Sequence, residues 1–264
     1  RVGGWLDLAV TLSDDRARTK SGRVYIDDFC RERDIPLVKS PNVNDAAVLD
    51  AVAAAELDWL FIIGWSQIAR APLLALPKRG ALGIHPTLLP EGRGRAAIPW
   101  TILKGLPRTG VTLFKMDAGV DTGPILAQEE LRVAPDETAR SLYDRVNAAH
   151  RTLIARAWPD LVADRLTPQP QDERSATNWP GRTPEDGRIT PERMTVTETD
   201  RLVRAVTDPY PGAFVDLPRG RLRVWAGTRH PDEADPSRAV AIALADGTYY
   251  ATRYTWEPLP ETSA

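Results

Sequence analysis

Two side chains able to exchange protons, His85 and Asp121, stand in the most patterned stretch of the chain, residues 80–123. His85 ends a short apolar run. Asp121 stands between Gly119 and Gly123, which permit backbone turns that other residues resist. A histidine held by a carboxylate can act as a general acid or base, because the carboxylate orients the ring and favours the imidazolium. From the residues alone, a packing histidine and a turn-forming aspartate remain the alternative.

The elements that must position this pair are two apolar runs of strand length. Residues 81–84 lead to His85, and residues 111–116 lead into the loop that carries Asp121. In an open α/β sheet, side chains at strand ends form the ligand site. We therefore expect His85 and Asp121 to meet from two neighbouring strand ends.

Strand-like and helix-like segments alternate in the first part of the chain, which predicts an α/β fold with a mostly parallel sheet. The run over 57–65 is apolar without polar alternation, as expected for a central strand covered on both faces. A long helix is predicted over 136–166. The other predicted strands cover 5–12, 35–38 and 125–133, and the other predicted helices cover 25–33, 45–55 and 72–76.

Residues 167–188 interrupt the pattern with four prolines, two glycines and many charges. We predict a linker there, between a catalytic domain over 1–166 and a smaller domain over 189–264. In the smaller domain, one amphipathic helix over 197–206 precedes four short strands with turn sequences between them. This spacing suggests a small, OB-like antiparallel β-barrel.

Composition limits the classes of partner. The 264 residues carry a net charge of −2, with 42% hydrophobic and 27% charged residues. The chain therefore lacks the basic footprint of a nucleic-acid binder, although a small phosphorylated ligand stays open. With a single cysteine, Cys30, and three histidines, neither an internal disulfide nor a structural metal site is expected, and Cys30 is predicted to lie in the core. No apolar run approaches the roughly 20 residues that span a bilayer, so we expect a cytoplasmic protein.

The motifs around His85 and Asp121 resemble those of the formyltransferases that use 10-formyltetrahydrofolate. They read Gly-Ile-His-Pro-Thr-Leu-Leu-Pro over 83–90, Gly-Arg-Gly-Arg-Ala over 92–96, and Met-Asp-Ala-Gly-Val-Asp-Thr-Gly-Pro-Ile-Leu over 116–126. This family includes the methionyl-tRNA, glycinamide ribonucleotide and sugar N-formyltransferases. The resemblance implies a Rossmann-like catalytic domain, 10-formyltetrahydrofolate as formyl donor and a primary amine as acceptor. The chain begins at Arg1 rather than Met, and by this resemblance we expect the family's first strand to be missing.

Carried over residue by residue, the resemblance places His85 and Asp121 at the catalytic histidine and aspartate. It implies that the donor is bound by three short segments: Ile63, Gly64 and Trp65; Leu88, Leu89 and Pro90; and Asp117, Ala118, Gly119 and Val120. Acceptor contacts are expected from Arg93, Arg95 and Tyr210. The two arginines are expected either to bind a phosphate or carboxylate group or to lie in a solvated loop.

One position departs from the family. Where the family has an asparagine two residues before the catalytic histidine, this chain has Gly83. Glycine offers no side chain to a developing oxyanion, and the loss of one such donor typically costs ~10²–10³ in rate. We expect a specialised branch in which another group supplies this bond, and we expect Gly83→Asn to leave the chain folded and not to lower transfer.

Several acceptors stay open. Residues 204–214 resemble the corresponding segment of the formyltransferase half of the bifunctional enzyme that modifies UDP-4-amino-4-deoxy-arabinose. A nucleotide-linked amino sugar is therefore favoured. Hydroxyornithine or another amino acid, and methionyl-tRNA, remain as alternatives. A non-catalytic folate or nucleotide binder is the alternative that Gly83 raises. The oligomeric state stays open, with a homodimer among the alternatives.

Overall fold

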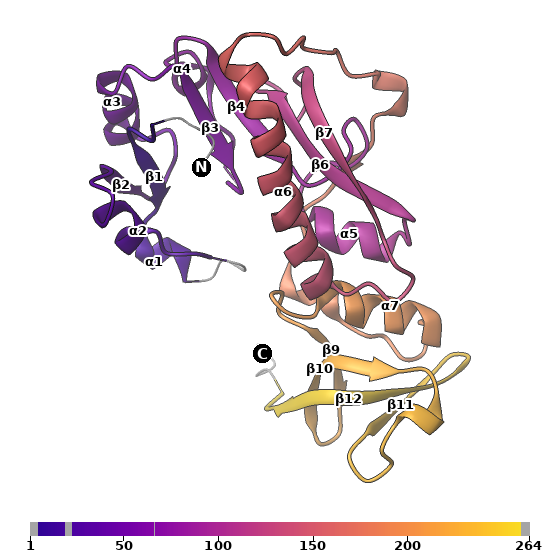
Figure 1. Cartoon of the computed structure of the whole chain (residues 1–264). Coiled ribbons are helices and arrows are strands. Elements are labelled where there is room, and N and C mark those ends of the chain that lie inside the picture. Colours follow the sequence, from indigo (N-terminus) through magenta and orange to yellow (C-terminus); the bar gives the residue numbers. More distant parts are fainter. Residues whose placement is uncertain (1–4, 19–22, 66, 260–264) are drawn as a thin grey trace. The chain divides into compact units, whose positions relative to one another are not determined.

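The computed structural model describes residues 5–18, 23–65 and 67–259 (Figure 1). The chain divides into two compact units that are interleaved in sequence. Unit 1 comprises residues 1–95, 109–131 and 146–179, and unit 2 comprises residues 96–108, 132–145 and 180–264. The division therefore differs from the predicted boundary after residue 166. Three elements begin in one unit and end in the other: β6 (Arg108–Lys115), β7 (Ile125–Arg132) and α6 (Ala139–Val162).

Unit 1 contains a four-stranded sheet and two two-stranded sheets. The four-stranded sheet has the strand order β3-β4-β6-β7, with β3 (Trp59–Ile63) and β4 (Gly80–His85) parallel and β6 antiparallel to β4. One of the smaller sheets is the parallel pair of β1 (Ala9–Leu12) and β2 (Leu37–Ser40). The α/β class and the Rossmann-like parallel arrangement of the first strands agree with the sequence prediction. The reversal at β6 could not be predicted, because an apolar strand has the same pattern in either direction.

Short helices cover the first strands. They are α1 (Asp14–Ala17), α2 (Asp27–Arg31), α3 (Ala46–Ala54) and α4 (Ala71–Leu74). Val48 and Val52 on α3 pack with Leu73 on α4 in one buried cluster, against which partly buried residues of β1, β2 and β3 lie. Cys30 is buried in α2, as predicted. α1 lies between the first predicted strand and the first predicted helix, where no element was predicted, and residues 19–22 lie outside the described residues.

The long helix α6 presents an apolar stripe at helical spacing. Its buried residues are Ala139, Leu142, Val146, Ala149, Leu153, Ala157 and Leu161, which recur every three or four positions along one face. Within unit 1, Trp158 approaches Phe61 of β3 with ring centroids 6.2 Å apart. Arg156 donates to the carbonyl of Gln128 on β7. The helix thus packs on the sheet that carries His85.

Residues 167–179 are part of unit 1 and do not form a linker. The backbones of Ile125 and Gln169 pair with each other. β8 (Asn178–Trp179) then pairs in parallel with β5 (Arg93–Gly94), and the 3₁₀ turn η1 (Glu173–Ser175) lies between these two contacts. The sequence gives little sign of this arrangement, because backbone pairing of an irregular segment leaves no hydrophobic period.

Unit 2 consists of helices and one antiparallel sheet. It contains α5 (Ala97–Leu103), the turn η2 (Pro184–Gly187), α7 (Val196–Val206), β9 (Ala213–Leu217), β10 (Gly220–Thr228), the turn η3 (Pro231–Glu233), β11 (Val240–Leu244) and β12 (Gly247–Glu257). The strand order is β11-β12-β10-β9, and α7 packs on β10. The predicted helix and four strands are all present. Within the described residues, β9 and β11 end the sheet without pairing with each other, so it is an open half-barrel and the OB-like barrel is not confirmed.

Candidate active site

The structure brings His85 and Asp121 together. His85 is the last residue of β4, and only 8% of its surface is exposed. Its Nδ1 lies 3.4 Å from Oδ2 of Asp121. Its Nε2 lies 2.7 Å from the carbonyl oxygen of Gly92. Both ring nitrogens are therefore directed at oxygen atoms.

The contact with Gly92 defines the role of Nε2. A carbonyl oxygen can only accept, so Nε2 must donate to Gly92. Nδ1 is the nitrogen that faces the carboxylate of Asp121. A proton on Nδ1 would complete an ion pair with this carboxylate.

Asp121 reaches His85 by a route different from the predicted one. Because β6 runs antiparallel to β4, its last residue, Lys115, lies beside Leu82, three residues before His85. The strand ends therefore do not coincide at one edge of the sheet. The loop over 116–124 must fold back towards the end of β4, and Lys115 closes it by donating its N–H to the carbonyl of Pro124.

Local hydrogen bonds hold the loop that carries Asp121. Asp117 Oδ1 accepts from the N–H of Gly119 and from the hydroxyl of Thr122. Asp121 has a φ of +54°, which an aspartate tolerates better than most residues. The N–H of Gly94 donates to Asp121 Oδ2 over 2.9 Å, so the oxygen that faces His85 also accepts a backbone hydrogen bond.

The space beside Gly83 is filled by an aromatic ring. Gly83 pairs with Phe114 across β4 and β6, on the face that also carries His85. A Cβ at position 83 would lie 2.6 Å from Cζ of Phe114. An asparagine at position 83 therefore requires the ring of Phe114 to shift.

The residues predicted to bind the donor fall into two groups. Ile63 pairs in register with Ile84, so the end of β3 lies beside His85, and Ile63 is 52% exposed. Asp117, Ala118, Gly119 and Val120 are exposed in the loop before Asp121. Gly64 has a φ of +65°, and half-buried Trp65 donates its indole N–H to Gln67. This first group can accept an apolar ligand beside the histidine.

The second group supports the loop after His85. Leu89 is buried, donates its N–H to Thr112 and accepts from Gln128 through its carbonyl. Its side chain therefore belongs to the core. Leu88 and Pro90 are half-buried, and Leu88 packs on Gly110.

The three residues predicted to contact the acceptor lie in different surroundings. Arg93 is 3% exposed, and its guanidinium bonds Gln171 and Glu173. The geometry argues against a role for Arg93 in gripping the acceptor, because its donors already have partners. Arg95 is exposed, and its guanidinium makes no hydrogen bond or ion pair within the described ranges. Tyr210 belongs to unit 2, where it is half-buried and burial raises its pKa.

Two residues that contact this site were assigned to the linker on sequence grounds. Gln171 donates to the carbonyls of Asp121 and Gly123, and Thr177 accepts from the N–H of Gly92. The only sequence signal was the Gly-Arg-Gly run at 92–94, whose glycines allow another chain segment to approach closely.

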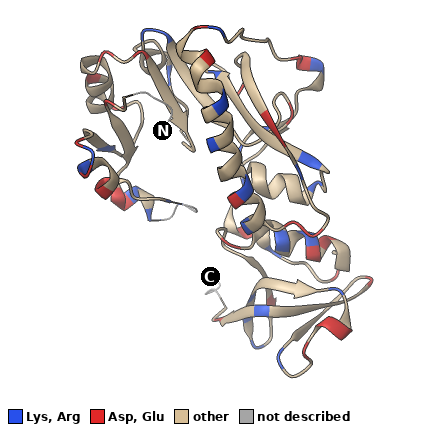
Figure 2. Ribbon diagram, viewed as in Figure 1, with Lys and Arg blue, Asp and Glu red and all other residues tan. Residues whose placement is uncertain are grey.

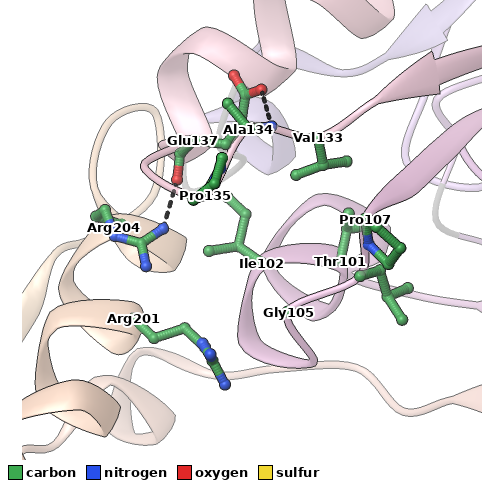
Figure 3. Close-up of a pocket in the computed structure, with 11 residues that line it drawn as sticks. Thr101, Ile102, Gly105, Pro107, Val133, Ala134, Pro135, Glu137, Arg201 and Arg204 are labelled. Atoms are coloured by element: carbon green, nitrogen blue, oxygen red, sulfur yellow. Dashed lines mark hydrogen bonds between the residues drawn. The ribbon is translucent and has the colours of Figure 1, made fainter.

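A cavity of about 290 Å³ lies within unit 2 (Figure 3). Arg204 of α7 donates to the backbone carbonyl of Glu137 and pairs with Asp200. The lining contains none of the predicted site residues and consists of Thr101, Ile102, Gly105, Leu106, Pro107, Val133, Ala134, Pro135, Glu137, Arg201 and Arg204.

The described residues offer neither a metal-binding cluster nor a membrane-spanning helix. No group of three or more His, Cys, Asp or Glu residues in that part of the chain could hold a metal ion. Among the described helices, none combines the length and the apolar character needed to cross a membrane.

Two family models match the chain. The model described as "Formyl transferase" matches residues 13–158, and the model described as "Formyl transferase, C-terminal domain" matches residues 182–254. The first match contains His85 and Asp121, and the second contains the four strands of unit 2.

Solved structures of similar fold include three kinds of protein. HypX from Aquifex aeolicus in complex with tetrahydrofolic acid shares 20% identity at a TM-score of 0.72, covering 95% of this chain and 44% of HypX. Methionyl-tRNA formyltransferase from Clostridium thermocellum shares 19% sequence identity at a TM-score of 0.64, and the match covers 96% of this chain and 100% of that enzyme. The sugar 3N-formyl transferase WlaRD was solved in the presence of dTDP and 5-N-formyl-THF. It shares 17% sequence identity at a TM-score of 0.66, and the match covers 94% of this chain and 87% of WlaRD. The chain thus spans less than half the length of HypX.

Proposed function

The chain belongs to the formyl transferase family, and from this membership we propose that it transfers the formyl group of 10-formyltetrahydrofolate to a primary amine of a nucleotide-linked amino sugar. The observation that carries the proposal is the pair of His85 and Asp121, whose Nδ1 and Oδ2 lie 3.4 Å apart. Both belong to the segment that the first family model matches.

The proposed chemistry uses His85 as a hydrogen-bond donor. When bound, 10-formyltetrahydrofolate supplies the formyl group as a carbonyl open to attack by an amine. The Nε2–H of His85 faces the Gly92 carbonyl in this structure, and it can turn to a reactant oxygen that gains negative charge. Asp121 orients the ring and favours its imidazolium form. The amine nitrogen would bond to the formyl carbon, and the bond from this carbon to N10 of the folate would break. The carboxylate of Asp121 can accept the proton that the amine loses, directly or through a water molecule, and a proton delivered to N10 completes the tetrahydrofolate product.

The residues near His85 fit a folate donor. Ile63 and Val120 expose 52% and 47% of their surfaces, and in this proposal they offer an apolar contact to the aromatic ring of the donor. Gly64 follows Ile63 and Gly119 precedes Val120 in the chain, so each of these two residues has a neighbour without a side chain. In this proposal, Ile63, Trp65 and the loop over 117–120 hold the donor.

Charge favours a small acceptor over tRNA. Residues 180–264 contain 11 arginines and no lysine against 13 acidic residues. Arg188, Arg221 and Arg223 are paired with carboxylates, and Figure 2 shows acidic and basic residues interspersed along the elements. Nucleic-acid affinity depends on unpaired cations that meet phosphates. The exposed guanidinium of Arg95 is suited to one phosphate or carboxylate of a small acceptor. The cytoplasmic location stays a prediction.

One observation favours a second candidate, a folate or nucleotide binder that does not catalyse transfer. Phe114 fills the space in which the family's asparagine would lie, so the oxyanion donor of that position is absent from this chain. The pairing of His85 with Asp121 argues against it, because a binder has no need of an imidazolium and carboxylate pair.

Transfer assays with a panel of amines test the proposal. The protein is incubated with 10-formyltetrahydrofolate and, separately, with nucleotide-linked amino sugars, hydroxyornithine or methionyl-tRNA, and the formylated product is identified by mass spectrometry. Asp121→Asn, which keeps the shape of the side chain and removes its charge, is the matched control. We expect an N-formylated amino sugar with the wild type only. Formylation confined to the amino acid or the tRNA would refute the acceptor, and donor binding without any transfer would support the binder.

A further inference from the structure

We propose that residues 169–179, here called the strap, hold the side chains of His85 and Asp121 in their relative positions, with Gln171 and Thr177 as positioning residues. The strap contacts the loop of Asp121 at one end and the backbone that faces His85 at the other. The proposal rests on the proposed function, since it gives the strap a role in the chemistry of that pair.

Gln171 fastens the loop that carries Asp121. Its Nε2 donates to the carbonyl of Asp121 over 2.8 Å and to that of Gly123 over 2.7 Å. These two carbonyls follow the catalytic carboxylate along the chain, so one amide group spans the turn. A single side chain thereby restrains the backbone from which Asp121 projects.

Arg93 fixes the orientation of the Gln171 amide. Its Nε and Nη2 donate to Gln171 Oε1 over 3.0 and 2.8 Å. Because a guanidinium only donates and a carbonyl only accepts, a flipped amide would lose these bonds on both sides. Arg93 also forms a two-bond fork with Glu173, two residues further along the strap. This explains why a buried arginine stands between Gly92 and Gly94.

Thr177 fastens the backbone that faces His85. The N–H of Gly92 donates to Thr177 Oγ1 over 2.8 Å. The N–H of Arg93 donates to the carbonyl of Thr177 over 2.9 Å. The main-chain bond restrains the peptide plane between Gly92 and Arg93, which contains the carbonyl that accepts from His85. The hydroxyl bond restrains the N–H of Gly92 on the other side of the same residue. The side chain of Thr177 therefore helps to hold Gly92 in the position from which its carbonyl accepts.

Two glycines are needed for the strap to fit. A Cβ on Gly92 would lie 2.8 Å from the ring of Trp179, and a Cβ on Gly94 would lie 2.4 Å from the Trp179 carbonyl. Both glycines also have positive φ values. Gly94 then donates its N–H to Asp121 Oδ2. The strap thus packs against the backbone groups that bond both members of the pair.

Steady-state kinetics of strap variants test this role, with the amine that the wild type formylates as acceptor. Gln171→Met keeps the length of the side chain and removes its four hydrogen bonds, two that the amide donates and two that it accepts. We expect kcat to fall roughly 10- to 100-fold, since misplacing catalytic groups by about 1 Å costs on that order, while KM for 10-formyltetrahydrofolate stays within about twofold. Gln169→Met is the matched control, because Gln169 is exposed and its side chain bonds only the carbonyl of Thr167.

Thr177 gives an independent pair of variants. Thr177→Val removes the hydroxyl with little change in shape and should lower kcat, whereas Thr177→Ser restores the acceptor for Gly92 and should restore kcat. Melting temperatures are measured for every variant. A kcat that follows the melting temperature, or a valine variant as active as the wild type, would overturn the proposal.

An assay independent of transfer separates failure of the strap from failure of the proposed function. The ring nitrogens of His85 are observed by ¹⁵N NMR and assigned by their loss in His85→Gln, in a chain with three histidines. Gln171→Met and Thr177→Val should shift both His85 resonances, and Gln169→Met should leave them unchanged. Unchanged resonances in both strap variants would refute the strap. If these shifts occur in a protein that formylates no amine, the proposed function fails and the strap stands.

Discussion

At the scale of single residues, His85 has no free ring nitrogen. Nε2 donates to the carbonyl of Gly92, and Nδ1 faces the carboxylate of Asp121. In the proposed mechanism, Nε2 exchanges its bond to Gly92 for one to a reactant oxygen, while Nδ1 keeps facing Asp121. We therefore expect the negative charge of Asp121 to matter more for the rate of formyl transfer than the shape of its side chain.

The first prediction follows from this division of roles. Asp121→Asn keeps an acceptor for the N–H of Gly94 but removes the negative charge opposite His85, and His85→Ala removes the ring. We expect each variant to lose roughly 10³-fold or more in the rate of formyl transfer, with a melting temperature close to that of the wild type. His230→Gln, at an exposed histidine of unit 2, serves as the control. Substantial transfer by either site variant would exclude the assigned pair.

The second prediction concerns Gly83 and Phe114. Because Phe114 is 2% exposed and its ring lies where a Cβ would go, Gly83→Asn overpacks a buried strand pair. We expect it to destabilise the protein by about 1–3 kcal/mol and to lower transfer. Phe114→Leu makes room, so Gly83→Asn should cost less in its presence. Urea denaturation of the two single variants and the double variant gives the coupling energy.

Independent sites add within about 0.5 kcal/mol. Additive costs at positions 83 and 114 would therefore show that the ring does not occupy the space of the missing side chain. A double variant with restored stability and a rate above the wild type would support a vacant oxyanion position. The sequence alone predicted a tolerated asparagine, because nothing at position 114 identifies it as the cross-strand neighbour of position 83.

At the scale of elements, the sequence predicted what hydrophobic period and capping residues encode. The four strands predicted in the smaller domain are present as β9 to β12, and α7 begins one residue before the predicted helix over 197–206. The motifs also predicted that His85 and Asp121 lie close together, and their Nδ1 and Oδ2 are 3.4 Å apart. The chemistry assigned to this pair stays a prediction. The strap could not be predicted from the sequence, because its role rests on side-chain bonds from Gln171 to backbone carbonyls distant in sequence. The direction of β6 could not be predicted either, so the sequence did not show that the loop over 116–124 must fold back to bring Asp121 to the end of β4.

The third prediction concerns the sheet of unit 2. Asp216 on β9 accepts from Arg221 on β10 and from Arg188, and these hydrogen bonds, that from Arg221 foremost, lower the pKa of Asp216 to about 2. The pKa of this group is lower in the folded than in the unfolded chain, where it is about 3.9. Its contribution to stability is therefore present above about pH 4 and is lost as the pH falls towards 2.

Asp216→Asn should remove this contribution. We expect about 1 kcal/mol less stability at pH 7, after allowance for solvent screening of a partly exposed group, and a shallower loss of stability between pH 4 and 2. Urea denaturation across this range measures both. Asp232→Asn, at an exposed aspartate, is the control. Parallel pH profiles for wild type and Asp216→Asn would contradict the assigned pairing.

At the scale of the whole molecule, charge is dispersed. The net charge is −2 over 264 residues, and the arginines of α7 and the sheet of unit 2 are largely engaged by neighbouring carboxylates. A surface of this kind steers a polyanion poorly, yet it leaves individual guanidinium groups such as that of Arg95 for a single phosphate.

The last prediction uses this difference to separate the acceptors. A site that contacts 6–10 phosphates of a nucleic acid loses ~10³–10⁵ in affinity between about 50 and 200 mM salt, whereas one or two contacts lose far less. We expect KM for the amino-sugar nucleotide to rise less than tenfold over this range, and bulk tRNA to leave the rate unchanged at either salt concentration. Arg95→Gln should raise this KM and flatten its salt dependence, because it removes one phosphate contact. A steep salt dependence together with inhibition by tRNA would show that a polynucleotide occupies the acceptor site.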